Sequence, residues 1–213
     1  TSRNSKSGQS VDARNLYLLP GLIDCHTHVF FTQTIEDKTF ENALVSELTI
    51  SEKTKEERAK LFLRQYLSEG FTSVCDLGNS GNFLDSKLKE QVASDSHYPD
   101  FFISGPGIAT HKGQFDSQTP MGLVNKEYRI INDKTNIEEL LSEYTKHNVD
   151  ILKIYADNSP GYGGINLNQI RFFLKSKKFK KITFHSIEKS SFMDLIKLKK
   201  VNIEHGTNAL IKN

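Results

Sequence analysis

The sequence predicts an α/β protein with a parallel sheet, and two observations lead to that prediction. Short apolar and β-branched runs alternate along the chain with segments of helical periodicity. Each strand-plus-helix unit takes roughly 25–45 residues, which is typical of right-handed βα units. About six such units are predicted, and they fit either a (β/α)8 barrel or an open doubly wound sheet.

The predicted strands are apolar runs that end at glycines or at polar side chains. The first follows the turn at Pro20 and Gly21. Between the third and fourth strands, residues 105–134 are rich in Gly and Pro and are predicted to form a long loop. The six strands are predicted at about 21–29, 71–76, 100–104, 149–155, 182–187 and 201–205.

Helices are predicted between these strands from apolar stripes and capping residues. The clearest spans about 54–69, where Thr54 and Glu57 form a capping box ahead of one apolar face. Thr135 and Glu138 predict the start of another. The other helices are predicted at about 83–94, 166–177 and 192–198, and residues 30–50 are predicted as a long loop with a short helix.

Composition limits the partners of the chain. Its 213 residues suffice for one sizeable core, and 37% hydrophobic residues with a net charge of +2 describe an ordinary soluble protein. Nucleic acid is therefore not expected as a partner. No apolar run reaches membrane-spanning length, so no membrane partner is expected either.

The cellular location of the protein is addressed by its two cysteines and by its first residue. Cys25 and Cys75 both lie in apolar, strand-like runs, which predicts small buried thiols and not a disulfide framework. The sequence begins at Thr1, so a removed signal peptide cannot be read from it. A cytoplasmic location is favoured, and export stays open.

Nitrogen-bearing side chains lie at the ends of four predicted strands. His26 and His28 stand two apart and so project to the same side of the first strand, and Lys153, His185 and His205 end the last three. In a barrel these strand ends surround one site, so the pattern favours the barrel over the open sheet. Neutral imidazoles bind Zn²⁺ well. The rival interpretations are a chance histidine pair and a snorkelling surface lysine at Lys153.

Five pieces of the sequence together carry a family resemblance. They are Pro-Gly-Leu-Ile-Asp-Cys-His-Thr-His (20–28), Gly-Phe-Thr-Ser-Val-Cys-Asp-Leu-Gly (70–78), Leu-Lys-Ile-Tyr (152–155), His185 and Ile-Glu-His-Gly-Thr (203–207). Through them the chain resembles the amidohydrolase superfamily of metal-dependent hydrolases. The lysine of the fourth strand and the Ile-Glu-His-Gly motif are most similar to the imidazolonepropionase and Xaa-Pro dipeptidase branch.

The resemblance implies a fold and a division of the chain. The fold is a TIM-type (β/α)8 barrel, incomplete here because only about six βα units are predicted, over residues 20–213. Residues 1–19 are expected to be a leader and a remnant of the β-sandwich domain of the family. The implied activity is hydrolysis of a C–N bond in an amide or a cyclic amide by metal-activated water.

The resemblance also implies a metal site and its ligands. Two divalent ions are expected, with zinc favoured and manganese or iron also compatible. His26 and His28 would bind one ion, and His185 and His205 the other. Lys153, carboxylated by CO₂ as in the family, would bridge the two. The substrate would be a small molecule, and the substrate-binding residues are expected to be His111 and Tyr155.

The chain departs from the family pattern at its end. In the family an aspartate on the eighth strand ligates metal and acts as general base, whereas this sequence stops at Asn213 after six predicted strands. No residue is therefore predicted as the catalytic base, and without one hydrolysis slows by about 10²–10⁴-fold. The unpaired strand edges predict a partner, either a second copy or a separate C-terminal chain.

Other functions are also compatible with the same residues. The chain could be a non-catalytic metal-binding or interaction protein, or a gene fragment, that retains the barrel motifs. A deaminase is a further alternative, since such enzymes generally use one metal and no bridging lysine.

Overall fold

The computed structural model describes residues 12–32, 38–78, 80–115, 117–157, 164–176, 178–198 and 201–206. Strands and helices alternate along these residues, and every strand pair is parallel. The α/β class with parallel strands is therefore confirmed. The elements are β1 (Leu22–Thr27), α1 (Phe40–Thr49), α2 (Glu52–Ser68), β2 (Phe71–Asp76), α3 (Leu84–Val92), β3 (Asp100–Ile103), β4 (Gly107–Ala109), α4 (Met121–Glu127), β5 (Tyr128–Ile130), α5 (Ile137–Lys146), β6 (Leu152–Tyr155), α6 (Leu167–Lys175), β7 (Ile182–Ser186), α7 (Lys189–Ile196) and β8 (Asn202–His205).

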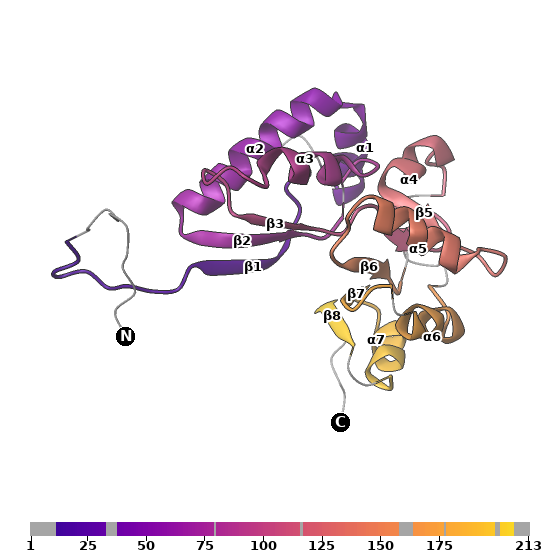
Figure 1. Cartoon of the computed structure of the whole chain (residues 1–213). Coiled ribbons are helices and arrows are strands. Elements are labelled where there is room, and N and C mark those ends of the chain that lie inside the picture. Colours follow the sequence, from indigo (N-terminus) through magenta and orange to yellow (C-terminus); the bar gives the residue numbers. More distant parts are fainter. Residues whose placement is uncertain are drawn as a thin grey trace.

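The described strands form two sheets that meet at one seam. One sheet has the order β1-β2-β3 and the other the order β5-β4-β6-β7-β8. The carbonyl of Ile103 in β3 accepts from the backbone N–H of Asp150 at 3.0 Å and of Ile151 at 3.3 Å, just before β6. Figure 1 shows α2 and α3 covering one side of the first sheet, with α6 and α7 beside the second. The strands thus line an inside, and the helices cover the outside.

The segment predicted as a long loop contains regular structure. Residues 105–134 include β4, α4 and β5, and β4 pairs with both β5 and β6. The loop prediction was wrong because three-residue strands such as Gly107–Ala109 are too short to show alternation in the sequence.

Two helix starts also differ from the prediction. The Ser51 side chain accepts from the backbone N–H of Thr54, so α2 begins before the predicted capping box. The Asn136 side chain caps α5 instead of Thr135. In both cases another Ser or Asn close in the sequence satisfies the free N–H groups of the first turn.

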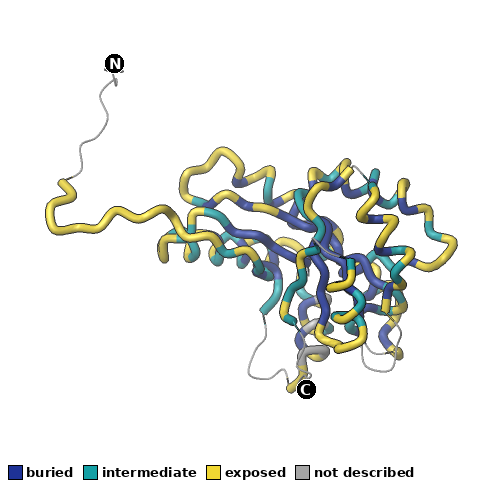
Figure 2. Tube along the Cα trace, turned by 90° about the horizontal axis from the view of Figure 1, so that it is seen from below, coloured by how far each residue is buried: buried dark blue, intermediate teal, exposed yellow. Residues whose placement is uncertain are grey.

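The core lies between the sheets and their helices, and the strands at both ends of the described structure have a free edge. Buried residues follow the strands through the centre of the molecule in Figure 2, whereas residues 12–19 are exposed. Among the described strands, β1 pairs only with β2 and β8 only with β7. Residues 12–19 form no strand, and the predicted division at 19 stays a prediction. None of the described helices is long and apolar enough to cross a membrane.

Candidate metal centre

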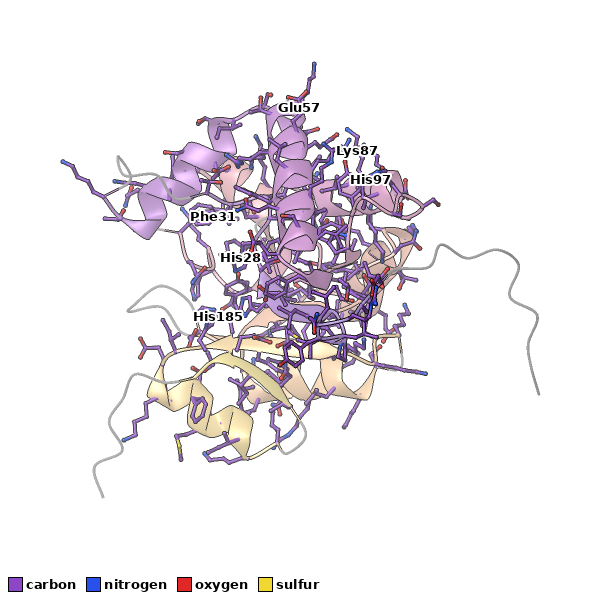
Figure 3. All side chains as sticks on the ribbon, turned by 90° about the vertical axis from the view of Figure 1, so that its left-hand side faces the viewer. His28, Phe31, Glu57, Lys87, His97 and His185 are labelled. Atoms are coloured by element: carbon purple, nitrogen blue, oxygen red, sulfur yellow. The ribbon has the colours of Figure 1, made fainter. Side chains whose placement is uncertain are left out.

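Four histidine rings gather where β1, β7 and β8 end. The ring centroids of His26 and His28 are 5.2 Å apart, those of His26 and His205 4.8 Å, and those of His185 and His205 4.7 Å. Figure 3 shows His28 and His185 in the same region of the molecule, with His97 well away from them. The cluster joins the edges of the two sheets, since β1 belongs to the first sheet and β7 and β8 to the second.

Lys153 lies buried inside this cluster. Its exposed fraction is 0%, and its Nζ is 3.5 Å from Nε2 of His26 and 5.6 Å from the ring centre of Tyr155. Burial lowers the pKa of Lys153 to about 8, and the Glu204 carboxylate opposes that shift. The rival interpretation of Lys153 as a surface lysine is therefore wrong. Burial therefore makes Lys153 easier to deprotonate than an exposed lysine.

Glu204 lies against the cluster, although strict alternation along β8 would place its side chain on the face opposite that of His205. Its carboxylate is 2.7 Å from Nδ1 of His26 and also binds the side chains of Thr183 and Asn202. His205, the last residue of β8, has φ 74°, a left-handed conformation that is uncommon for residues other than Gly. The side chains therefore stop alternating at the strand end, and both Glu204 and His205 reach the same space.

The hydrogen bonds of the first two histidines define which ring nitrogens remain available. Nδ1 of His26 faces the Glu204 carboxylate, and Nδ1 of His28 is 3.3 Å from the carbonyl of Gly78. Each Nδ1–H donates to its acceptor, which leaves the lone pair on Nε2 for another partner. His28 lies just beyond the end of β1 at Thr27.

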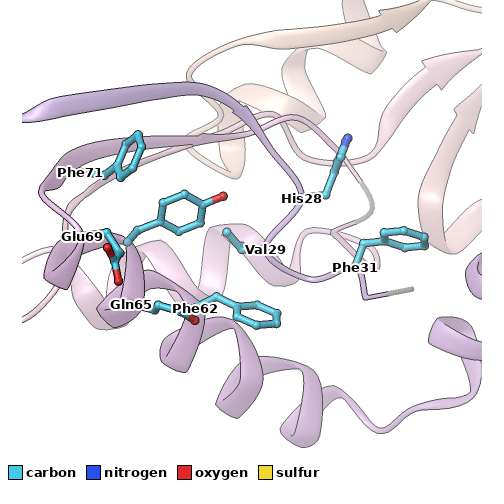
Figure 4. A pocket seen from close by; sticks show the side chains of 8 residues that line it. His28, Val29, Phe31, Phe62, Gln65, Glu69 and Phe71 are labelled. Atoms are coloured by element: carbon cyan, nitrogen blue, oxygen red, sulfur yellow. The ribbon is translucent and has the colours of Figure 1, made fainter. Parts of the chain in front are cut away.

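Burial keeps the rings neutral. It lowers the pKa of His28 to about 4 and that of His185 to about 3. It also lowers the pKa of His26 and of His205. His28 also lines a groove of about 360 Å³ together with Phe31, Phe62 and Phe71 (Figure 4).

Two side chains from separate loops, neither of them predicted from the sequence, contact His185. Its Nε2 is 3.6 Å from the Asp157 carboxylate and 3.5 Å from Nε2 of Gln114. Asp157 also accepts from the backbone N–H groups of Ile187 and Glu188 at 2.8 Å each. The only sequence cue was the position of Asp157, two residues after the fourth predicted strand.

The two predicted substrate-binding residues lie in different places. The Tyr155 ring stacks on His185 with centroids 4.9 Å apart, so Tyr155 borders the cluster. His111 lines a separate pocket of about 300 Å³ with Phe115 and Met121. The glycine-rich segment 161–163 lies outside the described residues. Substrate binding by His111 and Tyr155 stays a prediction.

Replacing Glu204 with glutamine is expected to lower the pKa of His26 further. The carboxylate at Nδ1 favours the protonated ring, and an amide oxygen favours it less. Titrating the histidine ring protons by NMR in the metal-free protein measures this shift. Glu57→Gln, an exposed change on α2, is the matched control. A His26 pKa that is unchanged or higher in Glu204→Gln would contradict the assignment.

The chemistry of these side chains fits divalent ions, although without metal the side chains lie too far apart to surround one. Neutral imidazoles and a lysine that can become neutral are suitable precursors of nitrogen and carbamate ligands. Within the part of the chain that the structure describes, no three His, Cys, Asp or Glu side chains lie close enough together to hold an ion by themselves. That these residues bind metal stays a prediction.

The parallel βα units bring the histidines and the buried lysine together in the arrangement of a barrel-type α/β protein, where such side chains meet at one end of the strands. The model described as "Amidohydrolase family" matches residues 17–209. The chain therefore belongs to the amidohydrolase family, and the predicted incomplete (β/α)8 barrel is confirmed. No curated protein matches the chain.

Solved structures with the same fold include amidohydrolases and prolidases. An amidohydrolase matches with a TM-score of 0.70 and 21% identity over 95% of this chain and 51% of its own. A prolidase complexed with N-methylphosphonate-L-proline matches with a TM-score of 0.64 and 20% identity over 90% and 50%. The ochratoxinase of A. niger has a TM-score of 0.64 and 17% identity over 84% and 46%. The chain thus spans about half the length of these structures.

Proposed function

We propose that this chain carries the metal-binding part of a hydrolase that cleaves the C–N bond of an amide or cyclic amide in a small molecule. The observation that supports this proposal is the gathering of four neutral histidines and one buried lysine at the strand ends. Family membership supports it independently. The prolidase among the solved structures indicates a dipeptide as one candidate substrate.

The residues would divide between two ions. His26 and His28 would hold one through Nε2, and His185 and His205 the other, with zinc favoured and manganese or iron compatible. The neutral amine of Lys153 would attack CO₂, forming an N–C bond and losing a proton, and the resulting carbamate would join the two groups of ligands. Bound ions of this kind polarise a carbonyl oxygen and lower the pKa of bound water from 15.7 towards about 7.

The chain's own side chains would orient these groups and exclude water. Glu204 holds the His26 ring with Nε2 towards Lys153, and burial keeps Lys153 able to lose its proton. Tyr155 covers one face of His185 and would contact the substrate there, whereas His111 would reach it only from the separate pocket that it lines. We assign the general base to none of the described residues. A partner that pairs with the free edges of β1 and β8, either a second copy or a separate C-terminal chain, would supply it.

Lys153→Ala is expected to reduce the bound metal per chain from two ions to one or none, because the proposed bridging ligand is lost. Elemental analysis after loading with zinc and dialysis at neutral pH measures this, and native mass spectrometry of the same samples reports any partner. Lys87→Ala, on the exposed side of α3, is the control and should retain the metal content of the unaltered chain.

The outcomes separate the alternatives. Absence of bound metal in the unaltered chain would overturn the hydrolase proposal. A single ion that Lys153→Ala retains would favour a deaminase with one metal. Two ions without turnover of dipeptides or cyclic amides, even with the partner present, would favour a non-catalytic metal-binding protein.

A further inference from the structure

The two cysteines lie side by side on neighbouring strands, which the sequence could not show. In the register of β1 and β2, Asp24 pairs with Val74 and Thr27 with Asp76, so an irregularity in β1 places Cys25 and His26 together opposite Cys75. Both cysteines line one cavity of about 580 Å³ on the inner side of the strands.

Neighbouring strands have the correct spacing for a disulfide. Strands lie about 4.7–4.9 Å apart, and the Cα atoms of a disulfide lie about 4.4–6.8 Å apart. Cys25 lies within the irregular stretch of β1 between Asp24 and Thr27. A disulfide between the two thiols is therefore compatible with the general spacing of neighbouring strands.

The two thiols differ in access. Cys25 is exposed, contrary to the prediction that both thiols are buried, whereas Cys75 is only 6% exposed. Burial raises the pKa of the Cys75 thiol to about 12. A reagent in solution can therefore reach Cys25 directly, while Cys75 reacts only with a group already attached beside it.

We propose that Cys25 and Cys75 form a dithiol site that low-molecular-weight disulfides, such as glutathione disulfide, oxidise to a cross-strand disulfide. Cys25 loses its proton and attacks one sulfur of the reagent, forming a mixed disulfide and releasing one thiolate. Cys75 then loses its proton and attacks Sγ of Cys25, which releases the second thiolate. The chain loses two electrons and two protons, and the reagent gains them as two thiols.

The test of this dithiol site does not depend on the proposed hydrolase activity. The disulfide would link β1 to β2 one residue before His26, on the wall of the cavity that Thr183 and Glu204 also line. Its formation needs no metal, and every readout below is made on metal-free protein. Failure of the metal-binding proposal would therefore leave this test unaffected.

Intact mass and thiol counting after incubation of the reduced, folded chain with glutathione disulfide test the proposal. The unaltered chain is expected to lose both free thiols and the mass of two hydrogens, with no glutathione attached. Cys75→Ala should stop with one glutathione on Cys25. Cys25→Ala should keep its remaining thiol until the chain is denatured. Circular dichroism and thermal unfolding establish that each variant is folded.

Peptide mapping of the oxidised, unaltered chain keeps the proposal testable if a variant fails to fold. A cross-linked peptide pair containing Cys25 and Cys75 is the expected result. A folded chain that carries glutathione on Cys25 beside a free Cys75, one that carries two glutathiones, or one that forms only disulfide-linked dimers would overturn the proposal.

Discussion

Replacing Lys55 with methionine is expected to lower the free energy of unfolding by about 3–5 kcal/mol. The side chains of Lys55 in α2 and Glu127 in α4 are 5% and 3% exposed, with Nζ and Oε1 3.9 Å apart. Glu127 Oε2 has no hydrogen-bond partner among the described residues. Without the ammonium group, the buried Glu127 carboxylate loses the largest of the interactions that oppose its desolvation. Urea denaturation at neutral pH measures the loss.

Two further variants test whether the loss of stability comes from the buried pair. Lys87→Met removes an exposed lysine that is bonded to Glu56 and should cost less than about 1 kcal/mol. The double variant Lys55→Met/Glu127→Leu should recover most of the loss, because an apolar pair needs no partner charge. A loss for Lys55→Met no larger than for Lys87→Met would contradict the expectation.

Acid is expected to destabilise the unaltered metal-free chain more than the His28→Gln variant. Burial lowers the pKa of His28 from 6.5 to about 4, so between these values the unfolded state binds more protons than the folded state. The free energy of unfolding therefore falls as the pH drops through this window. From the size of the shift, the contribution of His28 is on the order of 3 kcal/mol.

Denaturant unfolding at several pH values from neutral down to about pH 4 measures this difference. His97→Gln is the matched control, because His97 is an exposed histidine with 81% of its side chain accessible. Its stability should depend on pH as that of the unaltered chain does. Equal pH slopes for His28→Gln and the unaltered chain would contradict the neutral, buried state of His28.

The sequence predicted the long strands well and the short ones not at all. All six predicted strands are present, because runs such as Phe71–Asp76 and Ile182–Ser186 carry enough β-branched and apolar residues to be recognised. β4 and β5 were missed because each has only three residues. Their pairing depends on neighbours far away in the sequence, which no local pattern contains.

The grouping of the candidate metal ligands was predicted where it followed from strand ends. His26, His28, Lys153, His185 and His205 meet as the barrel geometry required, although their metal binding stays a prediction. The orientation of Glu204 was missed because simple alternation fails where His205 adopts a positive φ. Contacts of Gln114 and Asp157 with His185 join residues from separate loops, and only the folded chain brings them together.

The seam at Ile103 has a consequence for how the protein responds to a ligand. Few backbone hydrogen bonds join the two sheets there, whereas one hydrophobic cluster packs Ile103 of the first sheet with Leu152 and Ile154 of the second. His26 and His28 lie on the side of the first sheet, and Lys153, His185 and His205 on the side of the second. A ligand held by both groups would therefore link the two sheets and stabilise the folded chain by mass action.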